Sequence, residues 1–233
     1  MTHQTKNKWY NLAEDTNVEI KWNETTEVTI ENELKKGAIK IIKVDKENNE
    51  VKLQGVKFDI LDEKDNVLEQ IITNEEGEAI TSKYPVRDYE KIKIKEIETL
   101  EEYALNEEIK TIVLEENQIK DIVFENEKIK GQIEVLKISA NDNKITGDKK
   151  GTPIKGAEFN VLDSNGEIVD KLVTDENGKA VTKELYKGEY TIVEISSGSI
   201  YYLVNENEFK AEIKKHKEIV NVKVEEESNI LKL

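Results

Sequence analysis

The feature that most constrains this chain is an internal repeat. The segment "LQGVKFDILDEKDNVLEQIITNEEGEAIT", residues 53–81, aligns without a gap with "IKGAEFNVLDSNGEIVDKLVTDENGKAVT", residues 154–182, and most positions carry identical or similar residues. Several residue types recur at one constant offset, as in the pairs Gly55 and Gly156, Phe58 and Phe159, Thr73 and Thr174, and Gly77 and Gly178. Self-similarity over this length indicates two copies of one structural unit, so we expect the 233 residues to form two domains.

The local pattern within each copy is that of β-strands. Short runs rich in Ile, Val and Thr alternate with polar residues and are separated by turn signals such as Asn165-Gly166 and Asn177-Gly178. Residues 100–110 are the best helical candidate, but their counterpart in the second copy contains a glycine and a β-branched residue, so both segments indicate a loop running into a strand. We predict an all-β fold of tandem Ig-like β-sandwiches.

The repeat also sets the domain boundaries. The first copy spans residues 37–130 and the second spans 131–228, followed by a short tail at 229–233. Residues 1–36 parallel the end of the first copy, since "TIENELKKG" matches "VFENEKIKG" and places Asn32 at the position of Asn126. We therefore expect residues 1–36 to be the last two strands of a preceding, truncated domain, and the sequence to be a segment of a longer array.

Each copy opens with a strand that carries a lysine on its apolar face. In "GAIKIIKVDK", the side chains of Ile39, Ile41 and Lys43 point to the same side, because successive residues of a strand alternate between faces. The stretch "GQIEVLKISA" places Lys137 in the same way. A lysine at a strand end can lay its stem over apolar surface and keep its amine in water. Its recurrence in both copies favours a specific role instead.

Composition excludes several classes of function. The formal net charge is −15, and the basic residues are interleaved with Glu, which disfavours nucleic acids and anionic lipid surfaces as partners. No apolar run is long enough to span a bilayer, and we expect no membrane insertion in this segment. Cysteine is absent, and His3 and His216 are isolated. We therefore expect no disulfide, no metal site and no cofactor.

A set of motifs in fixed order resembles the Cna B-type (SpaA-like, prealbumin-like) domains of Gram-positive surface adhesins and pilins. The second copy contains "LKISAND", "GAEFNVLD", "VTDENGKA" and "LYKGEYTIVE", and the first replaces "LYKGEY" with "YPVRDYEKIK". A tyrosine follows the last Glu of this pattern by seven residues in each copy, at Tyr103 and Tyr201. The resemblance covers residues 37–228 and implies a Cna B-type, prealbumin-like β-sandwich for each copy.

For the first-strand lysine, the resemblance implies a covalent bond that the domain makes itself. In that family the lysine joins the side chain of an Asn or Asp on the last strand, assisted by a buried carboxyl group. The matching residues of the first copy are Lys43 as nucleophile, Glu96 as the assisting residue and Asn126 as electrophile. Burial favours the neutral, nucleophilic amine. The alternative is a buried ion pair of Lys43 and Glu96, hydrogen-bonded to Asn126.

The second copy departs from this pattern at one position. Lys137 and Glu194 match, but Glu226 stands where the first copy has Asn126. Asn221 is expected to point away from the interior, and Asn229 could reach it only through a bulge. The sequence therefore leaves two outcomes open, a cross-link that uses Glu226 or a simple pairing of Lys137 with Glu194.

The resemblance implies a mechanical function. We expect the stalk of a cell-wall-anchored, extracellular adhesin or pilus protein, monomeric, whose partners are neighbouring domains of the same protein and whose host ligand binds elsewhere in it. We expect no enzymatic activity beyond the single-turnover cross-linking. Acidic loops such as residues 45–50 lack the ligand spacing of a calcium loop. The alternative is a ligand-binding adhesin domain that recognises a host matrix protein or glycan through exposed aromatic residues, namely Trp9, Trp22, Tyr201 and Tyr202.

Overall fold

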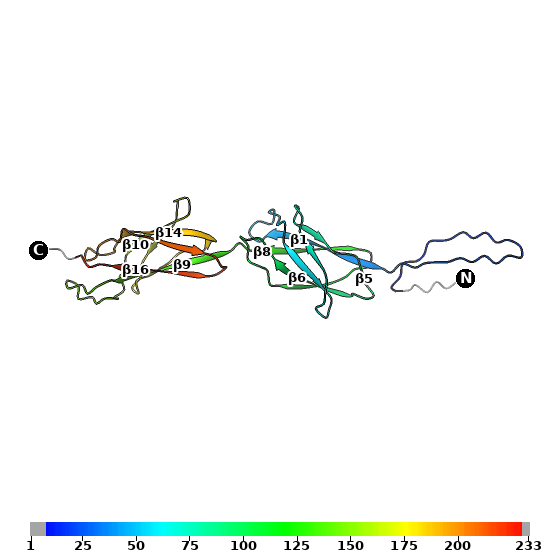
Figure 1. Cartoon of the computed structure of the whole chain (residues 1–233), viewed down its shortest axis with the longest axis horizontal. Coiled ribbons are helices and arrows are strands. Elements are labelled where there is room, and N and C mark those ends of the chain that lie inside the picture. The colour runs from blue at the N-terminus through cyan, green and yellow to red at the C-terminus, as the bar shows by residue number, and fades with distance from the viewer. Residues whose placement is uncertain (1–7, 230–233) are drawn as a thin grey trace. The chain divides into compact units, whose positions relative to one another are not determined.

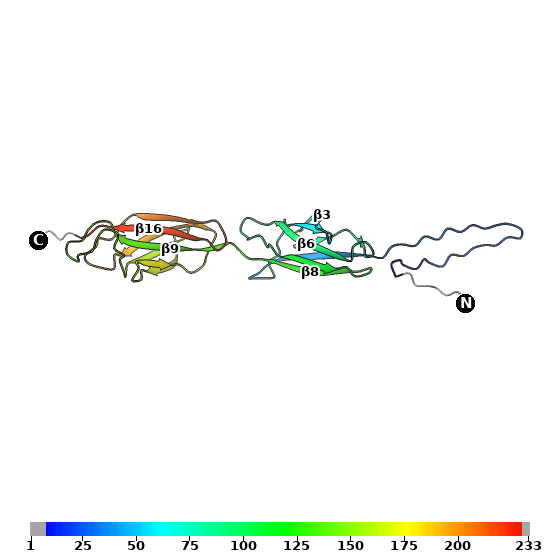
Figure 2. The ribbon, with the colours of Figure 1, turned by 90° about the horizontal axis from the view of Figure 1, so that it is seen from below.

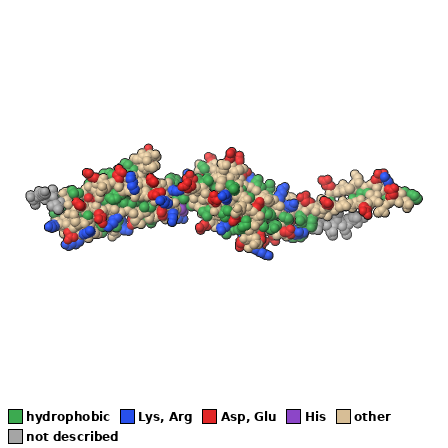
Figure 3. Space-filling view, viewed as in Figure 1, with side chains coloured by type: hydrophobic (Ala, Val, Ile, Leu, Met, Phe, Trp, Pro, Cys, Tyr) green, Lys and Arg blue, Asp and Glu red, His purple; other side chains and the backbone are tan. Residues whose placement is uncertain are grey.

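The computed structural model describes residues 8–229 and shows an all-β protein. The chain divides into two compact units, Met1–Glu127 and Lys128–Leu233, whose strands are labelled in Figure 1. The described residues contain strands, turns and loops, and no helix among them is long and apolar enough to cross a membrane. Charged side chains of both signs are interspersed over the visible face of each unit (Figure 3). The predicted fold class is confirmed.

Unit 1 is a sandwich of two four-stranded sheets. One sheet has the order β3-β2-β6-β7, and in the other β1 pairs with β4, β5 and β8. The strands are β1 (Lys36–Asp45), β2 (Lys57–Leu61), β3 (Val67–Ile72), β4 (Glu78–Ile80), β5 (Tyr84–Pro85), β6 (Lys91–Glu98), β7 (Ile109–Val113) and β8 (Ile119–Asn126). As expected, residues 100–110 form a turn that leads into β7.

Unit 2 repeats this arrangement strand for strand. One sheet has the order β11-β10-β14-β15, and in the other β9 pairs with β12, β13 and β16. The strands are β9 (Lys130–Ser139), β10 (Glu158–Leu162), β11 (Ile168–Val173), β12 (Lys179–Val181), β13 (Leu185–Tyr186), β14 (Gly188–Ser196), β15 (Glu208–Ile213) and β16 (Ile219–Glu226). The structural duplication thus follows the duplication in the sequence.

The first and last strands of each unit run side by side in the same direction. In unit 1, β1 and β8 pair in parallel over eight residues, from Ala38 opposite Ile119 to Asp45 opposite Asn126. The pairing of β9 with β16 in unit 2 is also parallel, and Figure 2 shows these two strands next to each other. A residue near the end of the first strand therefore comes close to the end of the last strand.

An aliphatic core fills the space between the two sheets of each unit. Ile39 and Ile41 of β1, together with Ile92 and Ile94 of β6, are completely excluded from solvent in unit 1. Along β9 in unit 2, buried and half-buried residues alternate strictly. Each inward-facing row is continued at the end of the first strand by the lysine that the sequence places on the apolar face.

A glycine turn fixes the backbone of that lysine in both units. In unit 1, Lys43 N donates a hydrogen bond to Gly77 O at 2.8 Å. A Cβ atom on Gly77 would lie 2.6 Å from Lys43 O, and its φ of 69° lies in the left-handed region. Gly178 has the same relationship to Lys137 in unit 2, with 2.4 Å for the corresponding distance. Only glycine satisfies both requirements.

Residues 8–35 of unit 1 precede β1 and form a long loop whose two ends are joined. Tyr10 and Leu34 form an isolated bridge, and Asn11 N donates to Glu33 O at 2.8 Å. Most of its large apolar side chains are exposed, among them Trp22 at 94%, whereas Trp9 is half-buried and packs against the core of unit 1. The assignment of residues 1–36 to a preceding domain stays a prediction, and residues 1–7 and the tail from residue 230 lie outside the described residues.

Candidate functional site

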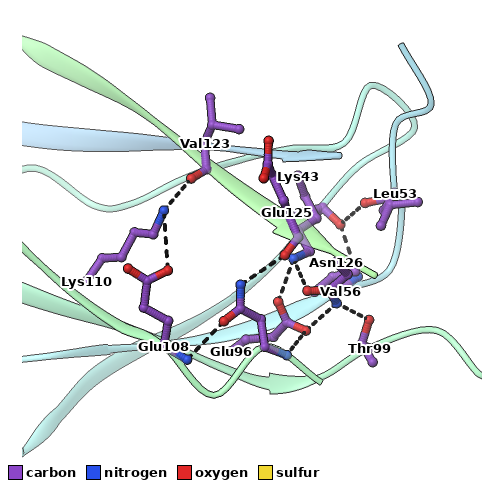
Figure 4. A network of polar contacts seen from close by, with 12 residues as sticks. Lys43, Leu53, Val56, Glu96, Thr99, Glu108, Lys110, Val123, Glu125 and Asn126 are labelled. Atoms are coloured by element: carbon purple, nitrogen blue, oxygen red, sulfur yellow. Dashed lines mark hydrogen bonds and ion pairs between the residues drawn. The ribbon is translucent and has the colours of Figure 1, made fainter. Parts of the chain in front are cut away.

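Three polar side chains meet in the interior of unit 1. Lys43 comes from the end of β1, Glu96 from β6 and Asn126 from the end of β8, so both sheets contribute. Their exposed fractions are 0%, 0% and 1%. Burying such groups costs free energy unless each is paired. The structure thus brings together the three residues that the sequence singles out in the first copy, as Figure 4 shows.

The three side chains form a closed set of contacts. Lys43 Nζ lies 2.7 Å from Glu96 Oε2 and donates to Asn126 Oδ1 at 2.5 Å. Asn126 Nδ2 donates in turn to Glu96 Oε1 at 2.5 Å. One carboxyl group therefore contacts both the lysine amine and the amide nitrogen of the asparagine. This geometry allows a proton to pass from one nitrogen to the other through Glu96.

Apolar surroundings control the protonation of the lysine. The rings of Phe58 and Phe124 lie 6.0 and 5.9 Å from Lys43 Nζ and pack edge to face against each other. Burial lowers the pKa of Lys43 below its ordinary value, against the opposing effect of Glu96, and the positive charge of Lys110 lowers that pKa further. A lower pKa favours the neutral amine, which is the nucleophilic form.

Two further residues support this site and were missed by the sequence analysis. Thr99 Oγ1 accepts a hydrogen bond from Asn126 Nδ2 at 2.7 Å and so helps to orient the amide. The backbone N–H of Asn106 donates to Glu96 Oε1 at 3.3 Å, while its side chain donates to Glu125 O. The available signal was the recurrence of a Leu/Val-Asn-Glu triplet, at Asn106 and at Asn205, after each assisting Glu.

Unit 2 brings together Lys137, Glu194 and Glu226 at the equivalent place. Their exposed fractions are 0%, 4% and 2%. Lys137 Nζ lies 2.6 Å from Glu194 Oε2 and also contacts Glu226 Oε2. The backbone N–H of Asn205 donates to Glu194 Oε2 at 3.2 Å, as Asn106 does in unit 1. Burial lowers the pKa of Lys137 and raises the pKa of Glu194.

The other asparagines near the end of unit 2 do not reach this site. Asn221 is exposed, as its place on the outer face of β16 predicts. Asn229 is half-buried, and its side chain donates to Ile200 O at 3.1 Å. Among residues 8–229, no group of three or more His, Asp or Glu side chains is arranged to hold a metal ion.

The tyrosine equivalence predicted from the sequence is wrong by one residue. Tyr103 is buried, and its hydroxyl donates to Asp45 Oδ2 at 2.7 Å. Its counterpart in unit 2 is Tyr202, exposed by 6%, rather than Tyr201, exposed by 38%. The hydrogen bonds of the next residues, Ala104 N to Glu127 O and Leu203 N to Glu227 O, establish this register. The loop of unit 2 is one residue longer, and Tyr202 is therefore not an exposed contact.

The fold and these buried sites define a tandem of prealbumin-like β-sandwiches. The chain belongs to the SpaA family of prealbumin-like fold domains, whose profile matches residues 37–128 and 131–228. The resemblance to Cna B-type, SpaA-like domains is thereby confirmed.

Solved structures were also compared with this chain. The Bacillus anthracis TIE protein is 28% identical to this chain with a TM-score of 0.67, and the match covers 84% of this chain and 35% of that one. The chain thus spans about a third of that protein's solved chain. The minor pilin GBS52 of Streptococcus agalactiae is 17% identical with a TM-score of 0.38, over 83% of this chain and 96% of that one. No protein of curated function matches the sequence.

Proposed function

We propose that the chain is part of the stalk of a cell-wall-anchored, extracellular surface protein, in which unit 1 locks itself with an amide bond between Lys43 and Asn126. The observation that supports this most directly is the position of Glu96, whose two oxygens contact the lysine amine and the asparagine amide nitrogen. Neighbouring domains of the same protein are its structural partners, and a host ligand binds elsewhere in that protein.

The proposed reaction needs no external reagent. Lys43 Nζ, in its neutral form, attacks Asn126 Cγ, and a new N–C bond forms. Glu96 moves a proton from Nζ to Nδ2, the Cγ–Nδ2 bond breaks, and ammonia leaves. The folded domain supplies the orientation that would otherwise cost several kcal/mol. The reaction occurs once per molecule, so the chain is not an enzyme in the ordinary sense.

The strand arrangement gives this bond a mechanical role. When unit 1 is pulled at the start of β1 and the end of β8, the parallel pairing of these strands is loaded along its length. A covalent bond between Lys43 and Asn126 joins the two strands near the ends where the pairing stops. Separation of the strands would then require breaking an amide bond. A stalk under tension benefits from such a link, which also constrains the unfolded chain as a disulfide does.

Intact mass under denaturing conditions tests the proposal. Formation of the bond in unit 1 should lower the observed mass by one ammonia relative to the mass calculated from the sequence. Tryptic mapping should find the peptides that contain Lys43 and Asn126 joined. The Asn126→Ala variant should lose this difference. If the two peptides are separate in the unsubstituted protein, Lys43 and Glu96 form only an ion pair. That result would favour the alternative function, a ligand-binding adhesin domain. Trp22, the most exposed aromatic residue among the described ones, would then be the first candidate contact.

A further inference from the structure

We infer that unit 2 carries a different cross-link from unit 1, an amide bond between Lys137 Nζ and Glu226 Cδ that forms with release of water. The inference extends the proposed function to a second site, and its product can be measured separately from that of unit 1. In place of the asparagine amide of unit 1, this site presents a second carboxyl group to the lysine.

The strand pairing brings the reacting groups together. Lys137 of β9 lies opposite Val224 of β16, so Glu226 follows two residues later on the same inward face. Its Oε2 contacts Lys137 Nζ. In unit 1 the same step leads from Lys43, opposite Phe124, to Asn126. Glu226 therefore occupies the position of the electrophile.

Glu194 has the other role in this arrangement. It comes from β14, as Glu96 comes from β6, and its Oε2 lies 2.6 Å from Lys137 Nζ. The backbone N–H of Asn205 holds that same oxygen at 3.2 Å, which fixes the carboxyl group beside the amine. The geometry thus separates the two carboxyls into an acceptor at residue 226 and a proton carrier at residue 194.

Charge balance favours the condensation. A single lysine can neutralise only one of the two buried carboxylates, and an uncompensated buried charge is strongly destabilising. Glu194 Oε1 is buried and has no hydrogen-bond partner within the described part of the chain. Joining Lys137 to Glu226 removes two of the three ionisable groups. The remaining Glu194, as a neutral acid, could then donate a hydrogen bond to the new amide oxygen.

The step balances without an added reagent. The neutral amine of Lys137 attacks Cδ of the protonated Glu226 carboxyl, and the Nζ–Cδ bond forms. Glu194 carries a proton from Nζ to the departing hydroxyl, the Cδ–O bond breaks, and one water leaves.

The residue that supports the acceptor in unit 1 has a different role in unit 2. Ser197 takes the place of Thr99, and its hydroxyl donates to the backbone oxygens of Ser199 and Tyr202.

The test compares the full chain with two variants, and the quantity measured is the difference between the mass calculated from the sequence and the observed mass. The unsubstituted protein should lack one ammonia and one water, with the peptides of Lys137 and Glu226 joined and no tryptic cleavage after Lys137. In Glu226→Gln the acceptor becomes an amide, so a second ammonia should replace the water. The matched control is Glu225→Gln, which changes the neighbouring side chain, exposed by 45%, and should still lose water.

Several outcomes would overturn the inference. They are free Lys137 and Glu226 peptides in the unsubstituted protein, a bond from Lys137 to Glu194, and water loss that persists in Glu226→Gln. If Glu226→Gln does not fold, the peptide map of the unsubstituted protein decides alone. If the Lys137–Glu226 bond is found but the Lys43–Asn126 bond is not, the proposed cross-link of unit 1 is wrong and this inference still holds.

Discussion

Glu96 Oε2 lies 2.7 Å from Lys43 Nζ in a site where both side chains are completely excluded from solvent. A buried ion pair of this kind contributes little net stability, because the cost of removing both charges from water offsets their attraction. Asn126 contacts both groups, and this arrangement supports the proposed cross-link as the reason for the buried pair.

Replacing Glu96 by Gln should prevent the bond in unit 1. Glutamine keeps the shape of the side chain but cannot carry the proton from the amine to the leaving nitrogen. We expect no loss of ammonia from this unit, and a free energy of unfolding lower by about 2 to 5 kcal/mol if the bond acts as a disulfide does. Mass spectrometry and urea unfolding measure the two effects. Glu98→Gln, an exposed control on the same strand, should change neither.

The Asn126→Ala variant should make stability depend on pH at alkaline values. Lys43 then stays ionisable, and burial lowers its pKa in the folded state below the ordinary 10.5. Between the folded pKa and 10.5 the unfolded chain binds more protons, so stability should rise with pH across that window. Urea unfolding at a series of pH values tests this, and the rise should disappear when Lys43→Met is added. A flat profile in Asn126→Ala alone would contradict the assigned pKa direction.

Thr99→Val should slow bond formation without abolishing it. The hydroxyl of Thr99 orients the Asn126 amide, and a hydrogen bond of this kind contributes about 0.5 to 1.5 kcal/mol, so we expect a rate lower by roughly twofold to twelvefold. The starting material is newly made protein, isolated rapidly in denaturant before the bond has formed. Refolding is then started, samples are returned to denaturant at successive times, and the loss of ammonia in each sample is measured by mass spectrometry. Thr111→Val, on the exposed face of β7, is the control and should react at the original rate.

Gly178→Ala should destabilise unit 2 more than Gly166→Ala does. Both glycines have positive φ, at 71° and 80°, so both substitutions cost about 1 kcal/mol or more in backbone strain. Only at Gly178 would the new Cβ also collide with a backbone oxygen, that of Lys137 at 2.4 Å, while nothing lies within 4 Å at Gly166. Thermal unfolding of the two variants compares them. Equal destabilisation would show that the approach to Lys137 is unimportant.

Much of the fold and part of the site could be predicted from the sequence. The repeat and the alternation of apolar and polar residues indicate two β-sandwiches, because a strand with one buried face must show a period of two. The same alternation places Lys43 and Lys137 inward, and it places Glu226 at the position of Asn126. These are local properties of a strand, so they are visible without knowledge of its neighbours.

The tertiary structure alone decided the contacts made by loops. Thr99 and Asn106 reach the site from the segment after β6, and no periodic pattern marks a side chain whose role depends on where a loop closes. The equivalence of Tyr103 with Tyr202 depends on one extra residue in the loop before Tyr202, and backbone hydrogen bonds to the residue after each last strand fix this register. The sequence by itself determined which strand residues face inward, because side-chain alternation is a property of each strand. The meeting of Lys43, Glu96 and Asn126 depends on how two sheets pack, and that is fixed by contacts between residues far apart in the chain.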